Sequence, residues 1–458
     1  MKRIYTTLLL AAITLFACQT VSAYDFEVDG IYYNINSYMT ANVTCGDHSY
    51  AGNIVIPATV TYNTKTLYVT GVDYYAFRGD SDLLSVQLPA SINRIRHEAF
   101  IGCTKLTSIV LPDEITEIGE KAFSGCTNLS SVVLPKRLKV LPNSIFEGCT
   151  NLSSIVLPDS ITSIEKRAFS GCSKLKDITF SPNITTIENE VFYKCKNLDH
   201  VVLPPLITTI KYRTFYWCTN LSSITIPENV TEIKEEAFYA CWRMKSIVLS
   251  KQLKTIEKEA FGHCGISTLT IPNHVTYVSD AFTGCRELTR LIIEDGTERL
   301  YFGTKLKLSY LYLGRNFTKE KDYYLSGDYT NLDAGMLDTL VFGSTFSDRS
   351  FPRGRNLKVV VSKIAKPYGM NFDSKVYANA ILYVPVGTKA LYESTDGWKQ
   401  FFNIQEGDPT TGIVSTKDDV NKVEVSRYDI NGQRLDSPRK GINIVRYSDG
   451  TTAKIVVQ

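Results

Sequence analysis

A single aromatic residue recurs along this chain at a constant interval of 23 residues. The regular positions are Phe77, Phe100, Phe123, Phe146, Phe169, Phe192, Phe215, Phe238 and Phe261, and Phe282 follows after a shorter interval of 21. Three residues after nine of these ten phenylalanines stands a cysteine, at Cys103, Cys126, Cys149, Cys172, Cys195, Cys218, Cys241, Cys264 and Cys285. A constant period of about 20–50 residues is typical of stacked supersecondary units. The sequence therefore predicts a solenoid, in which each repeat packs only on its neighbours.

The first half of each repeat predicts a short strand with one buried face. Leu106, Ile109 and Leu111 have the spacing of such a strand, and the same pattern returns 23 residues later. Pro112 ends the strand because proline cannot donate a hydrogen bond to a β-ladder. A second short extended segment, at 115–118, follows it.

The second half of the repeat favours a helical turn. The segment from Glu120 to Phe123 predicts one such turn, and the small Ala122 lets the phenylalanine enter the core. Gly125 and Cys126 then turn the chain towards the next strand. We therefore expect an α/β-type repeat solenoid, mostly β, built from 23-residue coils with a cap at each end. A parallel β-helix is the alternative, which the expected helical turn disfavours.

The repeat pattern L-x-x-I-x-L-P-x-x-I-x-x-I-x-x-x-A-F-x-x-C resembles the BspA-like class of bacterial leucine-rich repeats over residues 57–293. The Ala-Phe and Cys positions make the resemblance specific, because the general leucine-rich pattern lacks them. The resemblance implies a non-catalytic extracellular or cell-surface protein that serves adhesion or protein binding.

The chain start is typical of a secretory signal. Lys2 and Arg3 form its basic end, residues 8–16 are apolar, and small residues precede a cleavage point after Ala23. Cys18 is the alternative, as a lipidated cysteine. The expected segments are a signal peptide at 1–23, an N-terminal cap at 24–70, regular repeats at 71–293, degenerate repeats and a C-terminal cap at 294–404, a linker at 405–422 and a small β module at 423–458.

Local patterns predict the structure of both ends. A hairpin through Asn63-Thr64-Lys65 explains the extra residues before the first phenylalanine, and Trp398, Phe401 and Phe402 are expected to seal the far end. In the C-terminal module, Asn431-Gly432 and Asp449-Gly450 are hairpin-turn pairs. This module resembles the C-terminal sorting domains that carry Bacteroidetes proteins across the outer membrane.

Charge and cysteine content narrow the classes of function. The net charge is +3, and it falls to +1 without Lys2 and Arg3, so no field attracts nucleic acid or anionic membranes. The regular cysteines are expected to be buried thiols, because side chains of one column point the same way and cannot pair. CxxC spacing is absent, which gives no support for zinc.

Motifs for catalysis are missing from the sequence. No P-loop, nucleophile elbow or dinucleotide fingerprint is present, and no cofactor is expected. Asp177 and His200 occupy the same repeat position and should be neighbours on the strand face. An acid beside a histidine can transfer protons, but a surface ion pair is the favoured interpretation because no nucleophile or metal ligand accompanies it.

Two surface patterns are candidates for binding a partner. One is a column of β-branched residues on the strands, which includes Val133, Val156 and Val202. The other is an aromatic cluster in three consecutive repeats, made of Tyr193, Tyr216, Trp217, Tyr239, Trp242 and Arg243. Aromatic residues and arginine are enriched at protein interfaces.

The sequence as a whole favours a secreted or outer-surface protein that binds another protein. The expected partner is a host extracellular-matrix protein or another bacterial surface protein, and the sequence sets no oligomeric state. The alternative is a surface glycan-binding or carbohydrate-active protein on a β-solenoid.

Overall fold

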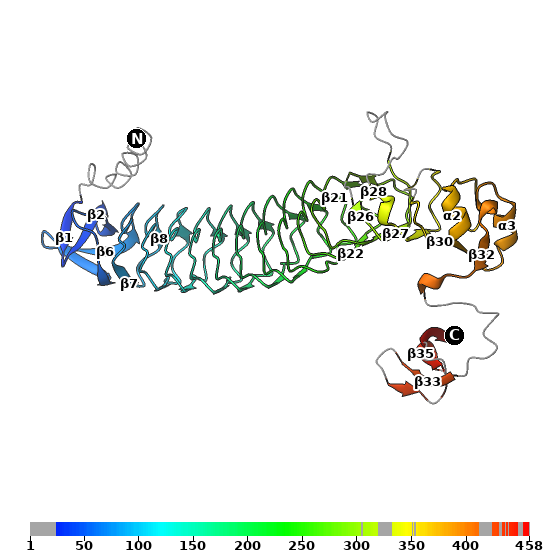
Figure 1. Cartoon of the computed structure of the whole chain (residues 1–458). Coiled ribbons are helices and arrows are strands. Elements are labelled where there is room, and N and C mark those ends of the chain that lie inside the picture. The colour runs from blue at the N-terminus through cyan, green and yellow to red at the C-terminus, as the bar shows by residue number, and fades with distance from the viewer. Residues whose placement is uncertain are drawn as a thin grey trace, which may run out of the picture. The chain divides into compact units, whose positions relative to one another are not determined.

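The computed structural model describes residues 24–303, 306–318, 332–349, 351, 354–411, 424–429, 433–435, 437, 439–447 and 452–457. The chain divides into two compact units, residues 1–288 and 289–458, and Figure 1 shows the stacked repeats of the first. The predicted signal peptide and Cys18 lie outside the described residues.

The first unit begins with an N-terminal cap that mixes antiparallel and parallel strands. Its strands are β1 (Phe26–Val28), β2 (Ile31–Ser37), β3 (Thr40–Thr44), β4 (Gly52–Val55), β5 (Thr59–Tyr62) and β6 (Lys65–Val72). β1, β2 and β3 pair antiparallel, and β3 then pairs parallel with β6. β5 and β6 form the predicted hairpin, in which Asn63 and Thr64 have positive φ angles of 49° and 65°, as a tight two-residue hairpin turn requires.

The first strand of each repeat follows the predicted position. These strands are β7 (Leu83–Gln87), β9 (Ser108–Val110), β11 (Ser131–Val133), β13 (Ser154–Val156), β15 (Asp177–Thr179), β17 (His200–Val202), β19 (Ser223–Thr225) and β22 (Thr268–Ile271). Where they pair they are parallel, and β9 and β11 match Ile109 with Val132, 23 residues on. The register therefore equals the sequence period, and in the three-residue strands the middle residue faces the core.

A second, shorter strand of each repeat forms another parallel ladder. Its members are β8 (Arg94–Ile95), β10 (Glu117–Ile118), β12 (Val140–Leu141), β14 (Ser163–Ile164), β16 (Thr186–Ile187), β18 (Thr209–Ile210), β20 (Glu232–Ile233), β21 (Thr255–Ile256) and β23 (Tyr277–Val278). Each of these strands has two residues, and the second residue is apolar and buried, as in Ile118 and Ile164.

The predicted helical turn is wrong. Residues 120–123 form hydrogen-bonded turns, and the described part of the first unit contains no α-helix. Lys121 has a φ of 56°, which a right-handed helix excludes. Its N–H donates to the carbonyl oxygen of Asn143 at 2.9 Å, and that of Phe123 donates to Ile145 at 3.0 Å. Hydrogen bonds between repeats thus replace the bonds that a helix would make along the chain.

The phenylalanine column forms the centre of the first unit. All ten rings are fully buried. Centroids of successive rings lie 4.8–5.8 Å apart, and their planes differ by at most 19°. Burial of each ring contributes roughly 1.5–3 kcal/mol from removal of apolar surface alone.

The nine regular cysteines are buried free thiols, as predicted. Each Sγ donates a hydrogen bond to the carbonyl oxygen of the phenylalanine in the preceding repeat, at 2.9–3.4 Å. The first repeat has Asp80 in the place of this cysteine, three residues after Phe77. The thiols therefore link each repeat to the one before it without any covalent bond.

The second unit is built around a parallel sheet of irregular repeats. Its strands are β24 (Arg290–Ile293), β25 (Tyr301–Phe302), β26 (Leu306–Lys307), β27 (Tyr310–Leu313), β28 (Leu332–Asp333), β29 (Thr339–Phe342), β30 (Val359–Ser362), β31 (Ile381–Val384) and β32 (Asn403–Glu406). The sheet runs in the order β24-β27-β29-β30-β31-β32.

Short helices cover this sheet towards its last strands. They are η1 (Ala334–Met336), α2 (Ser374–Asn379), α3 (Lys389–Ser394), η2 (Trp398–Gln400) and η3 (Pro409–Thr411). Trp398 and Phe401 are buried as predicted, and the Trp398 indole N–H donates to the Tyr368 carbonyl oxygen at 2.8 Å. The prediction for Phe402 is wrong, because its side chain is 84% exposed; Phe401 already fills the inward position.

The C-terminal β module is a four-stranded antiparallel sheet. Its strands are β33 (Glu424–Tyr428), β34 (Arg434–Leu435), β35 (Gly441–Tyr447) and β36 (Thr452–Val457), in the order β34-β33-β35-β36. The two predicted hairpin-turn pairs lie outside the described residues, but β33 pairs with β34 and β35 with β36 in the antiparallel manner that they imply.

Candidate functional site

The outward face of the first strands carries the predicted column of β-branched residues. Val133 on β11, Val156 on β13 and Val202 on β17 are 57%, 68% and 69% exposed. They are exposed because strand side chains alternate, and the residue before each of them points into the core. The face is therefore open to solvent along consecutive repeats.

The predicted tyrosine column is present at the turns that follow the phenylalanines. The rings of Tyr193, Tyr216 and Tyr239 stack with centroids 5.0 Å apart and planes within 10°. Burial in this stack raises the pKa of Tyr216 and of Tyr239. His263 extends the column, with its ring centroid 5.2 Å from that of Tyr239 and an angle of 62° between the two planes.

The backbone beneath this column adopts a conformation that suits glycine. Most repeats place a glycine with positive φ directly before the cysteine, as in Gly125 and Gly148. In the tyrosine repeats the same position holds Lys194, Trp217 and Ala240, with φ angles of 59–60°. A side chain in this region costs on the order of 1 kcal/mol or more. Four consecutive repeats, which include that of His263, thus accept local strain where glycine would avoid it.

Two tryptophans extend the aromatic surface beside the tyrosines. The centroids of Trp217 and Trp242 lie 5.6 Å apart at an angle of 58°. Trp242 is half-exposed, and the neighbouring Arg243 is exposed. We call the six residues Tyr193, Tyr216, Trp217, Tyr239, Trp242 and Arg243 the aromatic cluster. The structure brings them together, as their spacing predicts.

Arg213 connects the aromatic cluster to a second feature. Its guanidinium lies 5.0 Å from the ring centroid of Tyr216 and 4.8 Å from that of Tyr212. The hydrogen bond and ion pair of its Nε with Glu236 raise the pKa of Arg213. A cation held against two rings in this way fixes their orientation.

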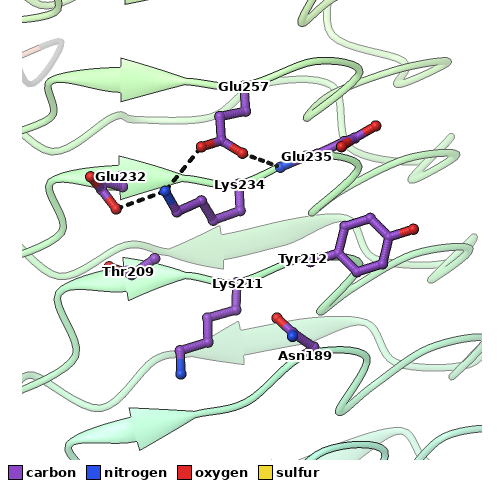
Figure 2. Close-up of a pocket in the computed structure, with 8 residues that line it drawn as sticks. All are labelled: Asn189, Thr209, Lys211, Tyr212, Glu232, Lys234, Glu235 and Glu257. Carbon is purple, nitrogen blue, oxygen red and sulfur yellow. Dashed lines mark hydrogen bonds and ion pairs between the residues drawn. The ribbon is translucent and has the colours of Figure 1, made fainter.

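Tyr212 lines a hollow of about 410 Å³ on the second strands of the same repeats. The hollow is bordered by Asn189, Thr209, Lys211, Tyr212, Glu232, Lys234, Glu235 and Glu257. Figure 2 shows Lys234 between two carboxylates: its Nζ lies 3.0 Å from Glu232 and 2.9 Å from Glu257. The hydrogen bonds to Glu257 and Glu232 raise the pKa of Lys234. The hollow therefore suits a ligand whose polar groups can replace one partner of the ion pairs that Lys234 forms.

Asp177 and His200 are the acid and histidine considered for proton transfer, but the described contacts of His200 are with other residues. His200 Nε2 lies 3.4 Å from the Asp199 carboxylate, and its Nδ1 lies 2.6 Å from the Ser223 hydroxyl. Asp199 also accepts from the Ser222 hydroxyl at 2.5 Å, and this bond, with the charge of His200, lowers the pKa of Asp199. The partners of His200 are thus the adjacent Asp199 and two serines of the next repeat, Ser222 and Ser223.

The described residues offer neither a metal site nor a membrane-spanning helix. No cluster of three or more His, Cys, Asp or Glu side chains there has the arrangement to hold a metal ion. None of the helices described has the length and apolar character needed to cross a bilayer.

Parallel 23-residue repeats, buried phenylalanine and cysteine columns and an open strand face together define a leucine-rich-repeat solenoid. The chain belongs to the BspA type leucine rich repeat family, whose repeat region matches residues 70–199, 162–289 and 208–329 in six copies. These matches span more than half of the chain. The sequence disfavoured a parallel β-helix because of an expected helical turn, which the described repeats lack. Membership of the leucine-rich-repeat family now provides the argument against a β-helix. No curated protein matches the chain.

Solved structures with a similar fold come from several bacteria. A leucine-rich repeat protein from Bacteroides ovatus ATCC 8483 is 23% identical, with 84% of this chain and 90% of that chain covered and a TM-score of 0.55. A leucine rich cell surface protein from Faecalibacterium prausnitzii A2-165 is 23% identical, covering 66% and 97%, with a TM-score of 0.41. A T. pallidum Leucine Rich Repeat protein is 28% identical, covering 48% and 89%, with a TM-score of 0.36. The first of these likenesses supports the solenoid fold.

Sequence reasoning missed Tyr212, Arg213, His263 and the hollow. The loss of glycine at Lys194, Trp217, Ala240 and His263 was a usable signal, because four neighbouring repeats depart from glycine at one position. Nothing in the spacing indicates the Arg213 contacts, since these depend on which way a long side chain turns.

Proposed function

We propose that this chain is an exported leucine-rich-repeat protein that binds a protein partner through the aromatic cluster. The observation that carries the proposal is the ordered stack of Tyr193, Tyr216 and Tyr239 beside the Trp217–Trp242 pair. Rigid aromatic groups with a polar tip supply contact area at little cost in conformational entropy, which is why they dominate binding energy at interfaces.

Local strain supports a role in binding. Trp217 and Lys194 occupy left-handed backbone positions at which other repeats have glycine. Strained residues persist where they serve a purpose that repays their cost, and they gather at binding sites. At the position before the cysteine, the replacement of glycine is confined to four consecutive repeats, and three of these carry the stacked tyrosines, which supports a functional origin.

The polar surroundings specify the kind of partner. Arg213 and Arg243 flank the rings, and the neighbouring hollow holds the paired charges of Lys234, Glu232 and Glu257. A partner surface with an apolar centre and a mixed-charge rim would match both features. We propose a host extracellular-matrix protein or another bacterial surface protein as this partner.

A substitution experiment tests the aromatic cluster. Tyr216, Trp217, Tyr239 and Trp242 are changed together to Ser, and circular dichroism verifies folding. The wild type and this variant are used as bait for matrix proteins and envelope extracts, with mass spectrometry as the readout. The matched control changes Tyr38 and Tyr68 to Ser, because both are exposed tyrosines of the N-terminal cap. Capture of the same specific partner by all three proteins would refute the proposal.

Export is the second part of the proposal. It rests on the signal-like residues 1–23 and on the resemblance of residues 423–458 to outer-membrane sorting domains. Cell fractionation of strains that express the full chain or a chain truncated after residue 422 tests it. Retention of the truncated form inside the cell envelope is the expected result, and equal surface display of both forms would remove the sorting role.

A glycan partner is the alternative, and the stacking geometry disfavours it. Sugars bind aromatic side chains through the ring face, but each face of Tyr216 already contacts a neighbouring tyrosine. Trp242 keeps part of its surface open. Affinity electrophoresis in polysaccharide gels would support this alternative if migration were retarded and the Trp242→Ser substitution abolished the retardation.

A further inference from the structure

The outward strand face of the first unit brings acids and bases together in two adjacent repeats. At residues 107–110, 130–133, 153–156 and 222–225 the chain holds only Ser, Thr, Val and Ile. In the repeat of β15 the corresponding positions begin with Lys176-Asp177, and in the repeat of β17 with Asp199-His200. Four charged or titratable groups therefore stand together, and an exposed Lys245 holds the same repeat position two repeats further on.

These four groups have opposite order in the two repeats. Reading across the face, β15 presents a base and then an acid, whereas β17 presents an acid and then a base. Lys176, Asp177 and His200 are exposed, and Asp199 is half-buried by Ser222 and His200. A rotation of 180° about an axis that runs between β15 and β17, parallel to the strands, brings each group opposite a group of the other kind.

We propose that this face binds the same face of a second copy of the chain. In the resulting dimer the two stacks run antiparallel, so that β15 of one copy faces β17 of the other. Lys176 then lies opposite Asp199 of the second copy, and Asp177 opposite its His200, each pair occurring twice. A surface that is complementary to itself is what an isologous two-fold contact requires.

In the same antiparallel dimer, the exposed valines of one copy lie opposite uncharged β-branched residues of the other copy. Val202 lies opposite Thr179, Val156 opposite Thr225, and Val133 opposite the segment that holds Val248, which is 84% exposed. Small and β-branched side chains let two sheet faces approach to roughly 10 Å, the spacing of packed sheets. The exposed valines would then be removed from water, which is the favourable term of the contact.

The antiparallel and parallel arrangements of the two stacks differ in which charges they bring together. A two-fold axis along the stack would instead pair groups of the same repeat, Lys176 with Asp177 and Asp199 with His200 of the second copy, so the two arrangements join different pairs. The occupant proposed is a second copy in the antiparallel arrangement, which of the two is the one that joins Lys176 to Asp199. This inference goes beyond the proposed function, because it uses the strand face and leaves the aromatic cluster free.

Sedimentation equilibrium of the full chain tests the dimer. We expect a species of twice the 51.3 kDa chain mass at micromolar concentration. Lys176→Asp places two acids opposite each other, and Asp199→Lys places two bases opposite each other. Each single variant should raise the dissociation constant at least tenfold. An equimolar mixture of the two variants should form a heterodimer, and the double variant in one chain should dimerise again.

The mixture separates the contact from effects on folding, because neither chain changes between the separate and the mixed samples. Val156→Glu provides an independent disruption, and Val140→Glu is its control, since Val140 is exposed on β12 of the other ladder. A wild-type monomer at tens of micromolar, or a dimer that survives both single charge reversals and Val156→Glu, would overturn the proposal. Neither result bears on capture of a partner by the aromatic cluster.

Discussion

The Sγ atom of Cys172 lies 3.1 Å from the carbonyl oxygen of Phe146, 26 residues earlier in the chain. The same bond recurs in each repeat that has a cysteine, so a buried thiol forms one of the regular side-chain links between successive turns of the backbone. Burial raises the pKa of Cys172 well above its ordinary value. A buried and protonated thiol is a poor nucleophile, because the thiolate is the reactive form.

Thiol reactivity follows from this environment. We expect Cys45, which is half-buried, to react first with Ellman's reagent in the folded chain without residues 1–23. The nine regular cysteines should react only after guanidinium unfolds the protein. Cys45→Ser should abolish the fast phase. Rapid modification of several thiols in the folded state would show that the cysteine column is accessible.

Removal of one ring from the phenylalanine column should be severely destabilising. Phe169 lies 5.7 Å from Phe146 on one side and 5.7 Å from Phe192 on the other. Phe169→Ala should cost on the order of 3–5 kcal/mol, because it removes apolar contacts and leaves a cavity. Guanidinium unfolding followed by circular dichroism measures this loss. Phe402→Ala is the control, and this exposed position should change stability by no more than about 0.5 kcal/mol.

The first repeat should respond to pH through Asp80. Burial raises the pKa of Asp80 to about 7, although hydrogen bonds from Tyr50 and Ser49 oppose the change. An acid whose pKa is higher in the folded state than in the unfolded state stabilises the fold at low pH, and this contribution is lost as pH rises through about 7. The wild type should therefore lose stability between about pH 4 and pH 8, by up to a few kcal/mol.

Asp80→Asn should remove this dependence. The variant should melt at a higher temperature than the wild type at pH 8, and the difference should shrink towards pH 4. Melting curves across this range provide the measurement. Asp82→Asn is the matched control, because Asp82 is exposed and pairs with Lys105 at 2.6 Å. A wild-type melting temperature that rises steadily from pH 4 to pH 8 would contradict the assignment.

Relief of backbone strain should stabilise the aromatic repeats. Ala240 has a φ of 60° at a position where most repeats have glycine. Ala240→Gly should raise the free energy of unfolding by about 1 kcal/mol, since glycine adopts this conformation without a steric penalty. Ala237→Gly, at a nearby buried residue, should lower it instead. Chemical denaturation of both variants distinguishes the effect of φ from a general effect of glycine.

Much of the first unit could be predicted from the sequence because the 23-residue period is also the register in which successive strands pair. The spacing of Phe123 and Cys126 placed both columns in the core, and the spacing of Tyr193 and Tyr216 placed their rings together. The turn around Lys121 could not be predicted in the same way. Its hydrogen bonds go to the next repeat, whereas helix propensity describes only what a segment does alone.

Features that depend on the direction of a side chain could not be predicted from the sequence either. The contact of Arg213 with Tyr212 and Tyr216 requires a particular rotamer of a long side chain. The left-handed backbone at Arg167 and Glu190 has no local signature, because these residue types do not favour it. Their ion pair, 2.7 Å from Arg167 Nε to the Glu190 carboxylate, joins adjacent repeats and becomes visible only once the repeats are stacked.

The equality of β-register and sequence period has an evolutionary consequence. A gene that gains or loses one whole 23-residue segment between β9 and β19 leaves every remaining ladder bond with an equivalent partner. Such an event lengthens or shortens the array by one strand spacing, roughly 4.8 Å. A change of another length would have to be taken up within a turn, as in the 21-residue interval from Phe261 to Phe282, whose rings still stack. Recombination among near-identical segments is thus a route by which this lineage can adjust its span in fixed increments while both terminal pieces stay intact.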